Sequence, residues 1–328
     1  MRLFRHISSI PSDARGAVVV IGNFDGLHRG HQVVIAAARA RADAPSDVGG
    51  QALALLTFTP HPRRFFRPDE DPFRLTPFRA KVRAIEALGV DTLFVCRFDA
   101  KMAAITADAF IEEILHRGIG ATHVVVGHDF AFGNKRAGNP DLLRSRGREL
   151  GFGVTIVEPA KDANEEIYSS SVIRQYLREG QPLRAADLLG RLWEIEGRVL
   201  RGDQRGRTIG FPTANIDPGE YVQPVRGVYA VRAGVPTDGK TRWYDGVANL
   251  GVRPTVDGSR LLLEAHLFDF DGDLYGRYLR VALVYFLRPE RKFDSLDALK
   301  QQIAADSRQA REKLTIYAQN SASQPHFR

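Results

Sequence analysis

The sequence predicts a two-part protein: an α/β domain built on a parallel sheet, followed by an antiparallel β domain with a C-terminal helix. Strand-like and helix-like segments alternate through the first half of the chain, which is typical of a doubly wound parallel sheet. From about residue 193, short strand-like runs follow one another and are separated by glycine and proline turns. With 328 residues, the chain is long enough for two domains that each bury a core.

Five apolar runs in the first half predict buried parallel strands. Each run is short, rich in aliphatic or β-branched residues and bounded by turn residues, as expected for strands covered on both faces. Sheets of this kind bind ligands at the carboxyl ends of their strands. The runs span residues 18–21, 52–58, 92–98, 123–127 and 154–159.

Helix-like segments connect these runs. We expect Thr76 to be the N-cap of one helix, with Pro77 at its first helical position. A polar, leucine-containing stretch from Glu179 to Arg191 is expected to link the two halves. The other predicted helices span residues 29–41, 107–116 and 140–150.

The second half reads as consecutive β-strands. No helical pattern interrupts the runs WEIEGRVL, TIGFPTANI, GVYAVRAG, WYDGVANLG, LLLEAHLFDF and YLRVALVYFL. Such a succession indicates an antiparallel barrel or sandwich. A helical tail from Ser295 to about Tyr317 follows these strands.

The composition is that of a soluble globular protein, with 44% hydrophobic and 26% charged residues. No apolar stretch is long enough to cross a membrane, and the N-terminus leads into no signal-peptide core, so we expect no membrane partner. The single cysteine, Cys96, lies in an apolar run and can form no internal disulfide. It is expected to be a buried small side chain in a cytoplasmic protein.

The net charge of +7 and the pI near 9.6 suit a phosphorylated ligand or a nucleic acid. The arginines are dispersed along the whole chain, and neither a basic block nor an RNA-type aromatic motif accompanies them. We therefore expect no nucleic-acid partner.

The ten residues Gly22–His31 carry the strongest chemical signal in the chain. They follow the apolar run 18–21 and lead into a predicted helix, so unpaired backbone N–H groups and a helix dipole meet at this turn. His28 and His31 are three residues apart and share one side of the first helical turn. Imidazoles placed there can donate hydrogen bonds to a phosphate whose charge rises during a reaction. The turn therefore predicts a nucleotide site.

Three further segments of the first half lie near strand ends. In TFTPHP, Phe58 and Pro60 could line an apolar wall for a flat ring, whereas His61 is expected only to form a turn. In VVGHDFAFG, Asp129 and its neighbouring phenylalanine could supply a polar and an aromatic contact. The serines of SSSVIR form either an ordinary helix N-cap or a second phosphate cradle, with Arg174 as a planar clamp.

The second half contains two candidate sites. The glycine-rich segment 202–215 is either a barrel turn or a nucleotide loop, and the chain has no GxxxxGK[ST] motif. Thr213 and Asn215 are two apart, so on a strand they share a face and offer hard oxygen ligands suited to Mg²⁺. Glu264, within an apolar strand, either faces solvent beside His266 or acts as a general base near a substrate hydroxyl.

Taken together, the segments of the first half resemble the nucleotidyltransferase family with the HxGH signature, specifically the FAD synthetase module of bacterial bifunctional riboflavin kinase/FAD synthetases. His28-Arg29-Gly30-His31 matches HxGH, and SSSVIR matches SSTxIR, with Ser171 in place of threonine. The resemblance implies a Rossmann-like domain over residues 1–185 that transfers AMP from ATP to FMN with Mg²⁺ and releases pyrophosphate. It implies that His28 and His31 are catalytic. ATP binding is implied for Gly22, Asn23, Phe24, Gly30, Ser170, Ser171 and Arg174, and flavin binding for Phe58, Pro60 and Asp129.

The second half resembles the riboflavin kinase module of the same bifunctional enzymes. The resemblance is carried by PTAN, by GVANLGVRPTV and by the strand that contains Glu264. It implies an antiparallel β-barrel with a C-terminal helix over residues 186–328, in which Glu264 is the catalytic base. Thr213 and Asn215 would hold Mg²⁺ and phosphates. A flap with Gly206, Arg207 and Gly210 would cover ATP, and Asn249 and Arg253 would bind the flavin.

The expected function is therefore two-step flavin synthesis: phosphorylation of riboflavin to FMN, then adenylylation of FMN to FAD. Riboflavin, FMN and ATP are the expected partners, and Mg²⁺ is the expected cofactor. The alternatives are an adenylyltransferase for another small phosphorylated acceptor and a basic nucleic-acid-binding protein. The oligomeric state is left open.

Overall fold

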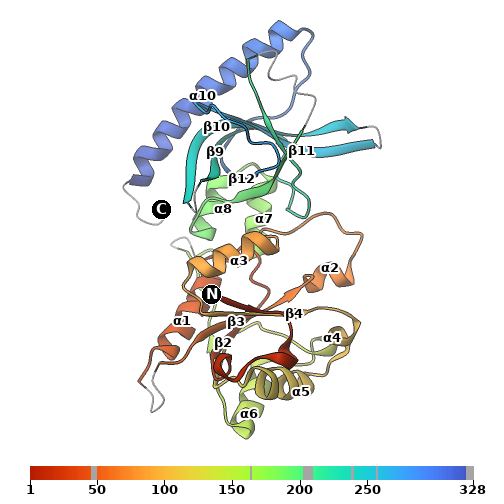
Figure 1. The fold of residues 1–328 in the computed structure, drawn as a ribbon, viewed down its shortest axis with the longest axis vertical. Coiled ribbons are helices and arrows are strands. Elements are labelled where there is room, and N and C mark those ends of the chain that lie inside the picture. Colours follow the sequence, from red (N-terminus) through yellow and green to blue (C-terminus); the bar gives the residue numbers. More distant parts are fainter. Residues whose placement is uncertain (46–49, 163–164, 202–209, 238–239, 256–257, 323–328) are drawn as a thin grey trace. The chain divides into compact units, whose positions relative to one another are not determined.

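The computed structural model describes residues 1–328 apart from 46–49, 163–164, 202–209, 238–239, 256–257 and 323–328. The described residues form two compact units (Figure 1). Unit 1 comprises Met1–Asp71 and Thr76–Ser169, and unit 2 comprises Pro72–Leu75 and Ser170–Arg328. Each unit has its own sheet, which confirms the predicted fold class of a parallel α/β part followed by an antiparallel β part.

Unit 1 is built on a six-stranded sheet in which every neighbouring pair is parallel. The five predicted strands are present within one or two residues of their expected limits. A sixth, at the N-terminus, was not predicted. Across the sheet the order is β1 (Arg2–Phe4), β4 (Thr92–Arg97), β3 (Leu53–Thr59), β2 (Val18–Ile21), β5 (His123–Gly127) and β6 (Gly153–Val157).

Helices cover both faces of this sheet (Figure 1). Val18 and Val20 of β2 pack in a core with α1 (Arg29–Ala42) and α3 (Phe78–Ala87). Alternate residues of the same strand point to the opposite core. That core includes α5 (Ala107–Ala109), the π-helix η3 (Phe110–Ile119) and α6 (Pro140–Leu150). Two short helices complete the unit: α2 (Pro62–Phe66) follows β3, and α4 (Ala100–Ala104) follows β4.

The strand order places a topological switch at β2. From β2 the chain proceeds to β3 and β4 on one side, whereas β5 and β6 lie on the other side. The connections that leave the carboxyl ends of β2 and β5 therefore diverge, and α/β sheets bind their ligands at such switch points. The Gly22–His31 turn begins at this point.

Unit 2 is a closed six-stranded barrel, which decides between the barrel and the sandwich that the sequence left open. All its paired strands are antiparallel. The C-terminal helix α10 (Leu296–Ala322) packs Ala310 and Leu314 against the barrel. Around the barrel the order is β10 (Lys240–Thr255), β11 (Gly258–Leu267), β8 (Ala214–Ile216), β7 (Glu194–Leu200), β12 (Tyr278–Arg288) and β9 (Gly227–Thr237).

Two local predictions were wrong. The expected linker 179–191 contains helix α8 (Pro182–Leu189), whose Ala185, Ala186, Leu188 and Leu189 are fully buried, so packing of an apolar face makes it part of the fold. Thr76 is not a helix cap, because α3 begins after Pro77 and the Thr76 hydroxyl accepts a hydrogen bond from Gly26 N instead. Helices α7 (Ser170–Arg178) and α8 both cluster with the barrel, and the domain boundary after residue 185 stays a prediction.

Candidate active sites

The turn after β2 reverses direction through backbone conformations that side chains rarely adopt. Phe24, Gly26 and Leu27 have φ values of 48°, 90° and 45°. Such conformations persist only where the surroundings hold them in place. Phe24 and Leu27 are each 1% exposed, so two buried apolar side chains anchor the strained turn to the core.

Two polar contacts, one from Thr76 shortly before α3 and one from Lys81 within it, hold the turn in place. The Asp25 carboxylate, 2% exposed, accepts a hydrogen bond from Thr76 N at 3.0 Å. Lys81, which is fully buried, donates from Nζ to the Asn23 carbonyl at 2.5 Å. Sequence reasoning missed Asp25 and Lys81, because their role depends on contacts between segments far apart in the chain. These contacts hold the turn at Asn23 and Asp25, and ATP binding is predicted for Asn23 and for the neighbouring Gly22 and Phe24.

The two histidines of the turn form a stacked pair. Their ring centroids are 3.7 Å apart with an interplanar angle of 22°, and the edge of Phe24 meets His31 at 5.4 Å. His28 is the N-cap of α1, where its Nδ1 accepts from His31 N at 3.4 Å. An accepting Nδ1 places the proton of the neutral ring on Nε2, which is then a donor. A Cβ on Gly30 would come within 3.1 Å of His28 Nδ1, so glycine allows the rings to stack beside the first helical turn.

Aromatic side chains gather at the carboxyl ends of β3 and β4. Phe58 of β3 meets Phe98 edge to face at 6.0 Å, and Phe98 also contacts Phe65 and Phe66 of α2 at 5.4 and 5.8 Å. Phe66 is 63% exposed, so part of this cluster faces solvent. An exposed aromatic group of this kind can stack against a flat ring. Of these four phenylalanines, sequence reasoning singled out only Phe58.

The other predicted flavin contacts of unit 1 are exposed. Pro60 directly follows β3, and Asp129 lies in the turn after β5. His61 is buried and caps α2, with its Nδ1 accepting from Arg63 N at 3.1 Å, which agrees with the structural role expected for it. Pro60 and Asp129 thus follow two strands whose carboxyl ends flank β2.

The SSSVIR segment supplies the start of α7. Ser170 and Ser171 are its first two residues, partly buried and exposed respectively. Arg174 is 7% exposed, and its Nε donates to the Phe73 carbonyl at 2.7 Å. One edge of the guanidinium is therefore engaged by the protein itself. This helix belongs to unit 2 and the histidine turn to unit 1, so the joining of the two motifs in one phosphate site stays a prediction.

A row of polar side chains crosses three strands of the barrel. Glu264 on β11 is directly opposite Asn215 on β8 and Asn249 on β10 in the strand register. Directly opposed residues of antiparallel strands share a face of the sheet. Asn215 is 9% exposed and the Glu264 side chain 22%, so this face is not simply solvated. The register brings together three residues for which metal, base and flavin roles are predicted.

Glu264 forms an ion pair with Arg253, whose side chain is 43% exposed. Arg253 of β10 donates to Glu264 Oε2 from Nε at 3.0 Å and also from Nη2. The carboxylate raises the pKa of the Arg253 guanidinium, so the arginine stays charged. Both contacts fall on Oε2, and Oε1 accepts from no residue that the structure describes. A general base needs such an oxygen within reach of the proton that it takes.

Glu290 joins this cluster and was missed by sequence reasoning. Its Oε1 accepts from Asn249 Nδ2 at 3.2 Å and lies 3.9 Å from Arg253 Nη1. The residue follows β12 in a Pro-Glu-Arg-Lys stretch that reads as a polar turn. No local signal ties that turn to Glu264.

The remaining nucleotide residues lie near the start of β8. Thr213 immediately precedes the strand, and Asn215 is its middle residue. Gly210 has a φ of +85° and lies on the surface. Gly206 and Arg207 lie outside the described residues.

The oxygen donors of this region fit Mg²⁺. The Asn215 amide is buried opposite the Glu264 carboxylate, and Mg²⁺ prefers hard oxygen ligands together with phosphate and water oxygens. Within the described ranges, no three His, Cys, Asp or Glu side chains form a cluster able to hold a metal ion by themselves.

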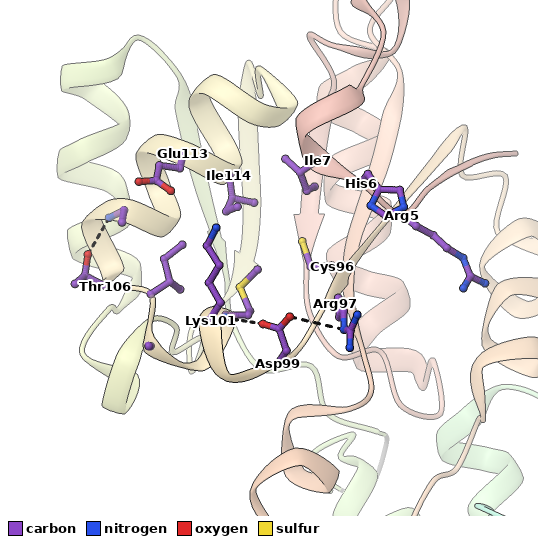
Figure 2. A pocket seen from close by; sticks show the side chains of 14 residues that line it. Arg5, His6, Ile7, Cys96, Arg97, Asp99, Lys101, Thr106, Glu113 and Ile114 are labelled. Atoms are coloured by element: carbon purple, nitrogen blue, oxygen red, sulfur yellow. Dashed lines mark hydrogen bonds and ion pairs between the residues drawn. The ribbon is translucent and has the colours of Figure 1, made fainter.

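A separate cavity of about 480 Å³ lies beside the carboxyl end of β4 in unit 1. Figure 2 shows charged side chains, among them Arg97, Asp99 and Lys101, around apolar ones such as Ile7 and Cys96. None of the predicted site residues lines it. Cys96 is 2% exposed, and burial raises the pKa of its thiol to about 12, which confirms the expected buried side chain.

None of the described helices is long and apolar enough to cross a membrane.

Two family models match separate parts of the chain. The FAD synthetase family matches residues 10–171, and the riboflavin kinase family matches residues 189–314. The first range contains the histidine turn, and the second contains the row of Asn215, Glu264 and Asn249.

Several curated relatives match the chain over nearly its whole length. The bifunctional riboflavin kinase/FMN adenylyltransferase of Escherichia coli K12 is 42% identical, with 95% of this chain and 97% of that protein covered. The protein of the same name from Bacillus subtilis is 37% identical, with coverage of 92% and 93%. Among solved structures, a macrolide-efflux protein from Streptococcus pneumoniae matches with a TM-score of 0.79 at 30% identity, covering 93% of this chain and 96% of that one.

Proposed function

The chain belongs to the family of bifunctional riboflavin kinase/FMN adenylyltransferases, and we propose that its two reactions are divided between the two motif-bearing sites. The reactions are phosphorylation of riboflavin by ATP to FMN, and transfer of AMP from ATP to FMN to give FAD and pyrophosphate. The family assignment decides against another phosphorylated acceptor and against a nucleic-acid-binding protein. The observation that carries the division is that each family model covers one of the two sites.

We assign adenylyl transfer to residues 1–185 and the turn after β2. The attacking phosphate of FMN is already an anion near neutral pH, since its second pKa is about 6, so no general base is needed. His28 and His31 donate to the α-phosphate region as its charge rises, an arrangement supported by the proton on His28 Nε2. The backbone of Gly22, Asn23, Phe24 and Gly30 surrounds ATP at the amino end of α1, where anions are favoured.

The other contacts of the adenylyltransferase follow from the surrounding strand ends. Phe58 and Pro60 form an apolar wall for the flavin, supported by the aromatic cluster at the ends of β3 and β4. Asp129 lies on the far side of β2 from these residues and provides a polar contact to the flavin. Ser170, Ser171 and Arg174 hold the triphosphate tail of ATP.

We assign riboflavin phosphorylation to residues 186–328. Glu264 accepts the proton of the riboflavin 5′-hydroxyl through Oε1 as the hydroxyl oxygen attacks the γ-phosphate of ATP. Thr213 and Asn215 hold Mg²⁺, which when bound neutralises charge on the phosphates. Asn249 and Arg253 orient the flavin beside Glu264. Gly206, Arg207 and Gly210 cover the nucleotide. With one deeply buried cysteine and phosphorylated substrates, the cytoplasm is the compartment that we propose.

The test is to incubate the protein with riboflavin, ATP and Mg²⁺ and to resolve FMN and FAD by chromatography. Glu264→Gln should abolish FMN formation and leave the conversion of supplied FMN to FAD intact. His31→Ala should do the reverse and accumulate FMN. If either substitution removes both activities while the protein stays folded, the division of labour is wrong.

A further inference from the structure

Glu290 contacts Asn249, which belongs to the row that contains Glu264, and also lies near Arg253, the partner of Glu264, although it comes from a different part of the chain. Its Oε1 lies 3.2 Å from Asn249 Nδ2 and 3.9 Å from Arg253 Nη1. Arg253 uses its other two guanidinium nitrogens, Nε and Nη2, on Glu264 Oε2. One guanidinium therefore lies between two carboxylates.

The backbone leaves room for this carboxylate at one position of β10. A Cβ on Gly251 would overlap Oε1 and Cδ of Glu290, so any larger residue there would displace the carboxylate. Gly251 lies midway between Asn249 and Arg253 on the same strand. The absence of a side chain at Gly251 thus leaves the space in which the Glu290 carboxylate reaches Asn249 and Arg253.

A buried ion pair fixes the segment from which Glu290 extends. Arg288, at the end of β12, donates from Nε and Nη2 to the Asp306 carboxylate of α10, at distances of 2.7 to 3.1 Å. The Asp306 side chain is 5% exposed, and it also accepts from Gln302 Nε2 at 2.6 Å. The segment after β12 is therefore held to the C-terminal helix two residues before Glu290.

We propose that Glu290 is a positioning residue of the riboflavin kinase site, which holds Arg253 so that its guanidinium contacts only one oxygen of Glu264. This inference rests on the assignment of Glu264 as the base. Arginine and carboxylate prefer a bidentate pair in which both oxygens accept. The attraction of Nη1 to the second carboxylate holds the guanidinium so that Nε and Nη2 both donate to Oε2, and Glu264 Oε1 is left to accept the proton of the substrate hydroxyl.

The charge of Glu290, rather than its shape, is the property that the proposal needs. Glu290→Gln keeps an oxygen that can accept from Asn249 but cannot attract Arg253. We expect the kcat for riboflavin phosphorylation to fall about 10- to 100-fold in both Glu290→Gln and Glu290→Ala, since small misplacements of reacting groups have effects of this size. The KM for ATP should stay within about twofold of the wild type, because Glu290 contacts Asn249 and Arg253, to which flavin roles are assigned. Glu290→Asp keeps the negative charge, and its kcat should be higher than that of Glu290→Gln or Glu290→Ala.

Gly251→Ala tests the same arrangement without touching Glu290. The added methyl group should displace the carboxylate and lower kcat to a similar extent. The double variant Gly251→Ala/Glu290→Ala should be no slower than either single variant, because both changes remove one interaction. Glu312→Ala, at an exposed position of α10, is the matched control and should leave kcat unchanged.

Adenylylation of supplied FMN and the melting temperature report whether each variant is folded. A Glu290→Gln enzyme with near-normal kcat beside a slow Glu290→Ala enzyme would mean that shape alone matters, and would overturn the proposal. Full activity of all Glu290 variants would also overturn it. Glu264→Gln in the same assay distinguishes a failure of the base assignment from a failure of the positioning role. If that variant still forms FMN, the assignment of Glu264 as the base is wrong. If it is inactive while the Glu290 variants are active, only the positioning role fails.

Discussion

Replacing Asp306 by asparagine should destabilise the barrel unit far more than the same change at Asp269. Each aspartate accepts from two nitrogens of an arginine guanidinium, Asp306 from Arg288 and Asp269 from Arg311, with distances between 2.7 and 3.1 Å. Both pairs join α10 to the barrel strands or their connections. They differ in burial, because the Asp306 side chain is 5% exposed and the Asp269 side chain 78%.

The expected magnitude follows from that difference. Asparagine keeps the shape of Asp306 but leaves the Arg288 guanidinium, with its side chain 19% exposed, without its counter-charge. Breaking a buried pair on one side costs about 3 kcal/mol, at the lower end of the usual range because Arg288 is partly exposed. For a unit of this size, about 3 kcal/mol corresponds to a decrease in Tm of about 6 to 12 °C. The exposed pair is screened by water and salt, so Asp269→Asn should change Tm by about 1 °C or less.

Differential scanning calorimetry of the full chain measures both variants under the same conditions. The transition assigned to the barrel should move in Asp306→Asn, and adenylylation of FMN should persist below that temperature. Similar Tm values for the two variants would refute the argument that burial decides the strength of these pairs. A shift of less than about 2 °C in Asp306→Asn would refute the estimate for the buried pair.

Two further predictions concern unit 1. Gly30→Ala should slow adenylylation of FMN about tenfold and leave riboflavin phosphorylation unchanged, since a Cβ 3.1 Å from His28 Nδ1 forces that ring to shift by a few tenths of an ångström. Equal FAD formation by the variant and the wild type would contradict this. Burial lowers the pKa of His123 below its ordinary value of 6.5, so the unfolded chain binds this proton first as the pH falls. The associated stability is present above about pH 6.5 and is lost progressively below it, and His123→Gln should flatten the dependence of Tm on pH over that range.

Local patterns were sufficient for the central strands and for most helices. Val18–Ile21 is buried on both faces, so its apolar run is continuous and easily recognised. The edge strand Arg2–Phe4 has only three residues and carries no such run, because its pairing with β4 depends on a partner far along the chain. Helix α8 was mistaken for a linker, since its apolar residues gain their meaning only from the barrel against which they pack.

The candidate sites divide in the same way. The histidine turn, the PTAN segment and Glu264 are recognisable because each combines unusual residue types within a few positions. Lys81 and Glu290 could not be recognised from the sequence, because each is an ordinary charged residue in its own segment. Their significance comes from contacts with Asn23 and Arg253, and no neighbouring residue in the sequence predicts those contacts.

Hydrophobic periodicity and motif composition are local properties of the chain, so the two-part fold class, the order of the main elements and the two motifs could be predicted from the residues alone. The folded chain was needed to show that the β strands close into a barrel and that the histidine turn lies at the switch point of the sheet. It was also needed to show that Asn215, Glu264 and Asn249 form one row. These features depend on strand order and register. Both are set by pairing between distant segments, whose combined packing determines which side chains share a face.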